Sequence, residues 1–156
     1  MPLTVREIAD LVRTWTTRLV LFARLWTDSP DDAVQEAFLR LYEQRARPDD
    51  AVAWLFKATR NAAIDISRSE ARRTRREKAA TNPKWFQPNA RSRWEVETLM
   101  DELQELSPEL REVVVAKVWG GLTFEQIGTS TATSRATAQR RYNEAIAILR
   151  KRLVAD

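Results

Sequence analysis

Hydrophobic side chains recur every three or four residues through most of this chain, which is the spacing of amphipathic helices. A capping box at Thr4 and Glu7 predicts where the first helix begins, because each side chain can satisfy a free backbone donor there. The stripe that follows predicts about six turns and consists of Ile8, Val12, Trp15, Leu19, Phe22 and Trp26. Ser29-Pro30 predicts a second helix, and a long third helix is expected from about Asp50 to Lys78.

Two further helices are expected after residue 93. The first runs from about 94 to 105 and shows its acidic side chains to solvent. The second begins at Ser107, with Pro108 in its first turn, and ends where Gly120-Gly121 supplies positive φ. The inward positions of this second helix are Leu110, Val113, Val114 and Val118.

The stretch 123–141 has the pattern of a helix-turn-helix. Thr123 and Gln126 repeat the capping-box spacing, and Ser134 is an N-cap candidate for a second helix that continues to about Leu153. The inward face of that second helix is formed by Ala138, Tyr142, Ala145 and Leu149. A short helix, a turn and a basic helix suit the DNA major groove, although an ordinary helical hairpin has the same outline.

The fold class predicted from these patterns is all-α, because no alternating strand-like run occurs and only three glycines are present. Residues 79–93 contain two prolines and little periodicity, so they are expected to link two small helical domains, 1–78 and 94–156. The second domain would contain the helix-turn-helix.

Composition narrows the chemistry. The chain has no cysteine and no histidine, which excludes Cys/His zinc sites, thiol catalysis and histidine general-base catalysis. No cofactor is implied, acids and bases converge in no recognisable catalytic site, and we do not expect an enzyme. Neither a signal peptide nor a membrane-spanning run is recognisable, so no membrane insertion and a cytoplasmic location are expected.

Charge is strongly segregated behind the net value of +4. Residues 51–93 contain eleven basic and three acidic side chains, whereas residues 94–133 contain two and eight. The stretch from 134 to the end is basic again. Two basic segments separated by an acidic one predict two separate contacts with a polyanion such as DNA.

Three exposed helix faces are expected to carry the binding residues. The long third helix presents a mixed aromatic, amide and cationic stripe made of Trp54, Lys57, Asn61, Asp65, Arg68, Arg72 and Arg75, in which Trp54 is expected to pack on the first helix instead. The last helix presents Ala136, Gln139, Arg140 and Asn143, with Arg135 and Arg141 on its flanks. The second helix presents Asp32, Gln35, Glu36, Leu39 and Arg40 opposite its inward residues Val34, Phe38 and Leu41.

These pieces, in this order, resemble an extracytoplasmic-function (ECF) RNA polymerase sigma factor. DDAVQEAFLRLYEQ (31–44) is similar to the family's core-polymerase-binding helix, and VAWLFKATRNAAIDISRSEARR (52–73) to its promoter-melting helix. LQELSPELREVVVAKVWGGLTFEQIG (103–128) and SRATAQRRYNEAIAILRKRL (134–153) are similar to its promoter-binding domain. The resemblance covers nearly the whole chain except the linker.

The resemblance implies the partners and the residues that meet them. Residues 1–78 would be sigma region two, and residues 94–156 would be sigma region four, which also meets the β flap of core RNA polymerase. The β′ clamp helices would contact Asp31, Asp32, Gln35, Glu36, Leu39 and Arg40. The minus-ten element of promoter DNA would contact Lys57, Arg60, Asn61, Asp65, Arg68 and Arg72. The minus-thirty-five element would contact Ser134, Arg135, Ala136, Gln139, Arg140, Arg141 and Asn143. Such proteins are commonly restrained by an anti-sigma factor.

One stretch departs from the family pattern. Residues 129–133 are Thr-Ser-Thr-Ala-Thr where the family usually has apolar residues and a turn glycine, and Ala138 replaces a branched side chain. A thinner hairpin core is therefore expected, with about 1–3 kcal/mol less burial for each missing branched side chain. The alternative function is a stand-alone helix-turn-helix regulator, which explains 103–156 equally well but leaves the basic helix 52–78 without a role.

Overall fold

The computed structural model describes residues 1–74 and 101–154, and no strand occurs among them. Its helices are α1 (Val5–Ala23), α2 (Pro30–Glu43), α3 (Ala51–Thr74), α5 (Pro108–Val118), α6 (Phe124–Thr131) and α7 (Arg135–Val154). Residues 101–105 are also helical. The all-α prediction and the helix-turn-helix are therefore confirmed.

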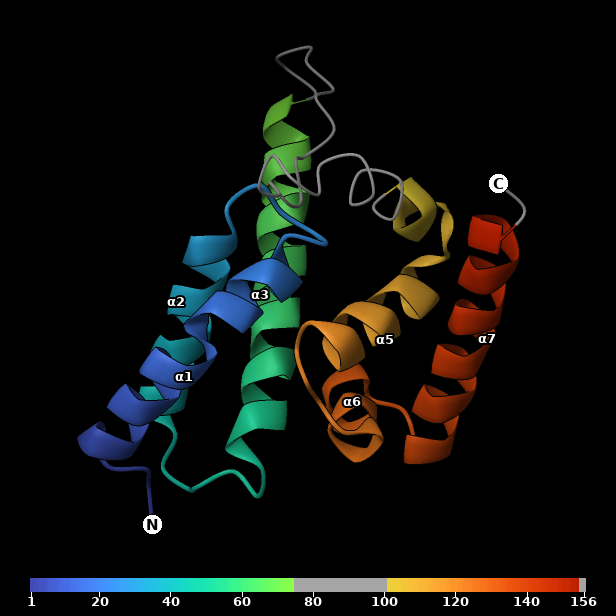
Figure 1. Cartoon of the computed structure of the whole chain (residues 1–156). Helices are drawn as coiled ribbons and strands as arrows, with labels where there is room; N and C mark the ends of the chain where they lie inside the picture. Colours follow the sequence, from blue (N-terminus) through green and yellow to red (C-terminus); the bar gives the residue numbers. More distant parts are fainter. Residues whose placement is uncertain (75–100, 155–156) are drawn as a thin grey trace.

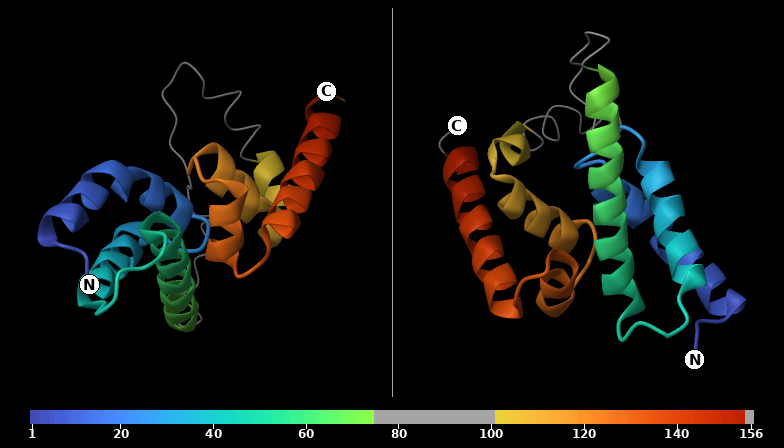
Figure 2. Two further views of the ribbon diagram at one scale, coloured as in Figure 1. Left: turned by 90° about the horizontal axis from the view of Figure 1, so that it is seen from below. Right: turned by 180° about the vertical axis from the view of Figure 1, so that it is seen from behind.

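The helices form two units that meet at α3 (Figures 1 and 2). In the N-terminal unit, residues 1–74, α1 and α2 pack against each other and against α3. In the C-terminal unit, residues 101–154, α7 packs against α5 and α6. Helix α6 also packs against α3, so α3 is the helix of the N-terminal unit that meets the C-terminal unit most extensively.

Three of the predicted helix starts are confirmed by their hydrogen bonds. The Glu7 N–H donates to Thr4 Oγ1 at 3.2 Å, and the Thr4 N–H donates to Glu7 Oε2 at 2.8 Å. The box at Thr123 has the same form, with distances of 3.1 and 2.9 Å to Gln126. Ser134 Oγ accepts from the backbone N–H at position 137 at 3.0 Å, so α7 begins where the sequence predicted.

Aromatic side chains fill the centre of the N-terminal unit. Phe22 and Phe56 are fully buried with ring centroids 5.1 Å apart, and Trp15 meets Phe56 edge-on at 6.0 Å. Such tilted and edge-on pairs place the positive ring edge against the negative face of its neighbour. The aromatics of α1 therefore serve the core, as their helical spacing predicts.

Helix α1 is shorter than the six turns predicted, because it ends at Ala23 instead of near Trp26. The Leu25 N–H donates to the Phe22 carbonyl and the Trp26 N–H to the Ala23 carbonyl, at 3.2 and 3.1 Å. These i→i−3 bonds tighten the chain into a turn after the helix. Trp26 still packs edge-on against Phe22, so its inward position is retained without helical backbone.

A side chain closes the helix that precedes α5. Arg111 donates hydrogen bonds to the carbonyls of Leu103, Gln104 and Leu106 at 2.9, 2.6 and 3.0 Å. A guanidinium is well suited to this role because it offers several donors and a positive charge to the negative end of a helix. Burial lowers the pKa of Arg111 from its ordinary value.

Most of the inward face predicted for α5 is confirmed, but Val118 is not part of it. Leu110, Val113 and Val114 are buried as expected, whereas Val118 is 54% exposed. The helix ends at Val118, where the chain turns away toward Gly121, whose φ is +69°. A residue in the last turn is covered only if the following chain packs over it.

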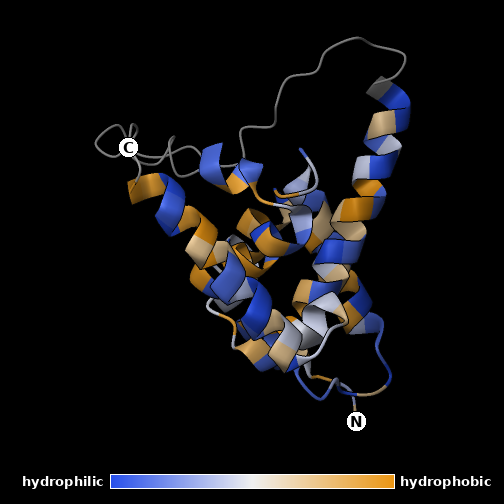
Figure 3. Ribbon diagram, turned by 90° about the vertical axis from the view of Figure 1, so that its right-hand side faces the viewer, coloured by the Kyte–Doolittle hydropathy of each residue, from blue (hydrophilic) through white to orange (hydrophobic). Residues whose placement is uncertain are grey.

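The polar turn of the helix-turn-helix is held by its own hydroxyls. Ser130 Oγ and Thr131 Oγ1 both donate to the Ile127 carbonyl, at 3.0 and 2.8 Å. Ala132 adopts φ +57° and ψ +39°, the left-handed conformation usually taken by glycine. Gly128 permits the close approach of α6 to the start of α7, since a Cβ there would lie 3.0 Å from the backbone nitrogen of Arg135. Figure 3 shows hydrophobic and hydrophilic residues alternating along α7, and the buried ones are Ala138, Ala145 and Leu149.

Candidate nucleic-acid and protein interfaces

Helix α3 presents most of its predicted minus-ten residues to solvent. The buried side of α3 includes Leu55, Phe56, Thr59 and Ala63, and this packing orients the helix. The exposed members of the predicted set are Lys57, Asn61, Asp65, Arg68 and Arg72. Cations and an amide along one helix are the groups that bind phosphates and base edges.

Arg60 is the exception in this set, because it contacts the C-terminal unit. Its Nε lies 2.5 Å from Oε1 of Glu112 on α5. The Arg60 side chain is 31% exposed and that of Glu112 only 6%. The guanidinium also lies 5.7 Å from the centroid of the Trp26 ring, within cation–π range. Burial raises the pKa of Glu112 above its ordinary value, and the charge of Arg60 opposes that rise.

The start of α7 forms a second exposed polar face. Ala138, Ala145 and Leu149 are buried against the C-terminal unit, and this packing turns the opposite side outward. The exposed members of the predicted minus-thirty-five set are Ser134, Arg135, Ala136, Gln139, Arg140 and Asn143. Arg141 is partly buried, in keeping with its predicted place on the flank. A helix start that carries amide and guanidinium groups has the inventory needed to reach base edges.

Helix α2 presents the third predicted face. Asp31, Asp32, Gln35, Leu39 and Arg40 are exposed, and Glu36 is half-buried. Within this face Arg40 Nε lies 3.0 Å from Glu36 Oε1 in an i,i+4 ion pair. Leu39 is 52% exposed, so an apolar side chain stands among charged ones.

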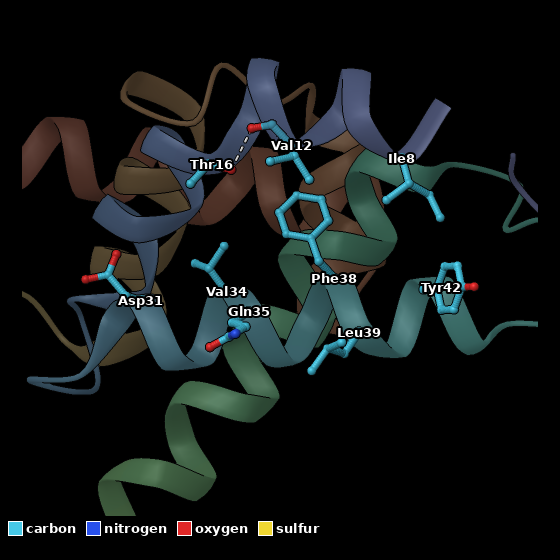
Figure 4. Close-up of a pocket in the computed structure, with 9 residues that line it drawn as sticks. All are labelled: Ile8, Val12, Thr16, Asp31, Val34, Gln35, Phe38, Leu39 and Tyr42. Carbon is cyan, nitrogen blue, oxygen red and sulfur yellow. Dashed lines mark hydrogen bonds between the residues drawn. The ribbon is translucent and has the colours of Figure 1, made fainter. Parts of the chain in front are cut away.

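An apolar groove borders this face, and the sequence pattern did not reveal it. The groove has a volume of about 420 Å³ and lies between α1 and α2 (Figure 4). Its lining comprises Ile8, Val12, Thr16, Asp31, Val34, Gln35, Phe38, Leu39 and Tyr42. Figure 4 shows Phe38 of α2 pointing toward Val12 of α1 across the groove. Val12 was predicted to be inward, yet it is 39% exposed because nothing in the described chain covers this end of the stripe.

Glu70 ties the turn between α1 and α2 to the far half of α3. Its carboxylate accepts from Thr27 Oγ1 at 3.1 Å and from Ser29 Oγ at 2.9 Å. Thr27 Oγ1 in turn accepts from the Ser29 N–H at 3.0 Å. Through these bonds, the start of α2 is fixed relative to the exposed cations of α3.

The described residues contain neither a helix that is long and apolar enough to cross a membrane nor a cluster of carboxylates suited to a metal ion.

Comparison with known proteins agrees with this layout. Residues 5–73 match the family model described as Sigma-70 region 2, and residues 97–149 match the one described as Sigma-70, region 4. Together these matches span most of the chain, which therefore belongs to the sigma-70 family of RNA polymerase sigma factors, in its ECF group. As such it acts in transcription initiation, with core RNA polymerase and promoter DNA as partners.

Two relatives show how far the similarity extends. The chain is 29% identical over 133 residues to the RNA polymerase sigma factor CarQ of Myxococcus xanthus, covering 79% of this chain and 74% of CarQ. Its fold is similar to that of CnrH, solved in complex with the cytosolic domain of CnrY. The TM-score is 0.66 at 23% identity, and the likeness covers 98% of this chain and 91% of CnrH.

Proposed function

We propose that this sigma factor divides promoter recognition between its two units. Residues 1–78 form region two, which binds core polymerase and the minus-ten element, and residues 94–156 form region four, which reads the minus-thirty-five element. Residues 79–93 link the two regions. Each unit has a small basic surface, and phosphate contacts alone would give weak, salt-sensitive binding. A polymerase that holds both units at one spacing makes binding of the second DNA element intramolecular. The resulting effective concentration strengthens binding to promoters that have both elements at that spacing.

The face of α2 is the proposed contact with the β′ clamp helices. Asp31, Asp32 and Glu36 would meet cationic side chains, which sets encounter rate and register more than affinity. Leu39, which lines the groove, would add an apolar contact with the clamp helices beside the charged ones. The groove and the charged rim lie side by side, and this is the observation that carries the assignment.

The exposed cations of α3 are the proposed contact with the minus-ten element, at the point where the strands separate. Arg68 and Arg72 are exposed and lie in the second half of α3. The start of α7 is the proposed reader of the minus-thirty-five element, with Gln139 and Arg140 nearest the bases. The chain acts by binding and supplies no catalytic group of its own.

Two further aspects belong to the same proposal. The protein works in the cytoplasm, where its polymerase and promoter are. An anti-sigma factor restrains it, a proposal supported by its likeness to CnrH, whose solved structure contains the cytosolic domain of CnrY.

Capture by purified core polymerase tests the assignment of α2. Asp32→Lys combined with Glu36→Lys should abolish capture and run-off transcription while leaving helix content unchanged. The control is Glu105→Lys with Glu109→Lys, which makes the same change of charge on exposed positions of the C-terminal unit. Wild-type capture by the α2 variant would refute the assigned face. Tight, sequence-specific DNA binding by the parent protein without polymerase would instead favour a stand-alone regulator.

A further inference from the structure

Helix α3 carries an acidic side chain in the middle of its cationic face. The helix contains two acids, and one of them, Glu70, holds Thr27 and Ser29 through hydrogen bonds of 3.1 and 2.9 Å. The other, Asp65, is exposed, and no hydrogen bond or ion pair involves it within the described part of the chain. Its carboxylate is therefore available to a partner outside this chain.

The spacing of α3 offers Asp65 an intramolecular partner with which it does not pair. Arg68 follows three positions later, and side chains at this spacing are neighbours on the surface of a helix. Asp10 and Arg13 on α1 have the same spacing, and they do form an ion pair. Asp65 and Arg68 form none in the part of the chain that the structure describes. The carboxylate and the guanidinium thus face solvent separately, and each can bind a different group of the DNA.

Exposed cations lie on both sides of Asp65 along the helix axis. Lys57 comes eight positions before it and Arg72 seven positions after it, which is about 12 Å and about 10 Å along an α-helix. These cations suit the sugar-phosphate backbone, whereas a carboxylate repels a phosphate. The acid therefore disfavours any docking in which the backbone passes opposite Asp65, and it favours one in which a base edge lies there.

The chemistry of a carboxylate restricts which base it can bind. An ionised carboxylate only accepts hydrogen bonds, so the base must present a donor. In the major groove guanine presents two acceptors, and thymine presents an acceptor and a methyl group. Adenine presents its N6 amino group beside the acceptor N7, which would repel the second carboxylate oxygen. Cytosine presents its N4 amino group without a neighbouring acceptor and is the base that an acidic side chain fits best.

We infer that Asp65 is a specificity-determining residue that selects a cytosine, on either strand, within the minus-ten element. The inference rests on the proposed function, because it requires that the exposed face of α3 contacts this element. Lys57, Arg68 and Arg72 supply affinity that is independent of sequence, since phosphates are the same at every position. Asp65 supplies discrimination, partly by binding the correct base and partly by leaving a carboxylate without a donor when the base is wrong.

Selection from a promoter library randomised across the minus-ten element tests the assignment. Holoenzyme that contains the parent protein should enrich cytosine at one position by about tenfold over the other bases. In Asp65→Ala that preference should disappear while the other positions keep theirs. In Asp65→Asn it should shift toward adenine, because an amide binds adenine N6 and N7 together. Asp101→Asn neutralises an exposed aspartate of the C-terminal unit and should select the same bases as the parent.

A cytosine analogue that lacks the exocyclic amino group tests the contact at a single atom. Placed at the selected position, it should lower the affinity of the parent holoenzyme for the promoter by about tenfold. The same analogue should lower the affinity of Asp65→Ala holoenzyme much less, because the two changes remove the same contact and their effects are not additive. Equal losses in the parent and in Asp65→Ala would show that the amino group does not act through Asp65, and would overturn the inference.

Further outcomes separate this inference from the proposed function. If Arg68→Ala weakens promoter binding but Asp65→Ala selects the same bases as the parent, the role of Asp65 alone is overturned. If Asp65→Ala loses selection at every position with its helix content intact, Asp65 positions the helix instead of reading a base, and the inference is again overturned. If the parent holoenzyme selects no minus-ten sequence at all, the proposed function of α3 is overturned, and the inference with it.

Discussion

The carboxylate of Glu7 accepts a hydrogen bond from the backbone N–H of Thr4 at 2.8 Å and also lies 2.8 Å from a guanidinium nitrogen of Arg47. Both partners favour the ionised carboxylate, the Thr4 N–H most strongly, and they lower the pKa of Glu7 to about 2. The contact joins the start of α1 to the segment between α2 and α3.

A pH dependence follows from this lowered pKa. Because the folded-state pKa lies below the ordinary value, the stabilisation by Glu7 is complete above pH 4.5 and is lost as pH falls through about 2. A carboxyl-carbon NMR titration should place the midpoint of Glu7 near 2. In Arg47→Ala the midpoint should rise only partway, since the Thr4 N–H remains. A midpoint near 4.5 in the parent would contradict the contact.

Two buried threonines should respond oppositely to the same substitution. Thr59 is fully buried, and its hydroxyl has no hydrogen-bond partner within the described part of the chain, whereas Thr27 bonds to Glu70. Thr59→Val should raise the free energy of unfolding by about 1 kcal/mol, and Thr27→Val should lower it by about 1–3 kcal/mol, because it leaves Glu70 short of a donor. Urea unfolding followed by tryptophan fluorescence measures both. If both substitutions changed the free energy of unfolding in the same direction, the difference in hydrogen bonding between Thr59 and Thr27 would be contradicted.

The exposed cations of α3 should contribute to the salt dependence of promoter binding. Arg68→Ala and Arg72→Ala should each weaken the holoenzyme–promoter complex and lower its log–log salt slope by about one unit, because one phosphate contact is lost. Arg13→Ala, on an exposed part of α1, removes the same charge and serves as the control. Unchanged slopes in both α3 variants would mean that this face is only solvated.

Base reading should depend on Gln139 and Arg140 but not on Arg141. Loss of a bidentate contact costs about 1–3 kcal/mol and relaxes the preference at one base pair. Selection of upstream sequences by Gln139→Ala and Arg140→Ala holoenzymes should therefore show one relaxed position each. Arg141→Ala should weaken binding evenly across sequences. Identical stringency in all of them would show that the start of α7 does not read the groove.

Local features of the fold could be predicted from the sequence because they depend on neighbours in the chain. The capping boxes at Thr4 and Thr123 need two side chains three positions apart, and the structure contains both. Helical spacing also identified the buried side of α7, including Ala138 and Leu149. The exposure of Arg140 follows from that same spacing.

Features that depend on distant segments could not be predicted in this way. The family resemblance placed Arg60 among the minus-ten residues, but its partner Glu112 lies 52 positions away in an apolar run. Helical spacing likewise predicted that Val12 and Phe38 point inward, but it could not show whether another element covers them. No described element does, and the groove between α1 and α2 lies there. The turn at 129–133 lacks the expected glycine, and Ala132 takes the left-handed conformation in its place.

The bonds of Glu70 to Thr27 and Ser29 have a mechanical consequence. They hold the start of α2 against the second half of α3, so the two helices are expected to move together. A partner that binds α2 therefore also fixes the orientation of Arg68 and Arg72 on α3. The proposed polymerase contact on α2 and the proposed DNA contact on α3 therefore keep one relative orientation.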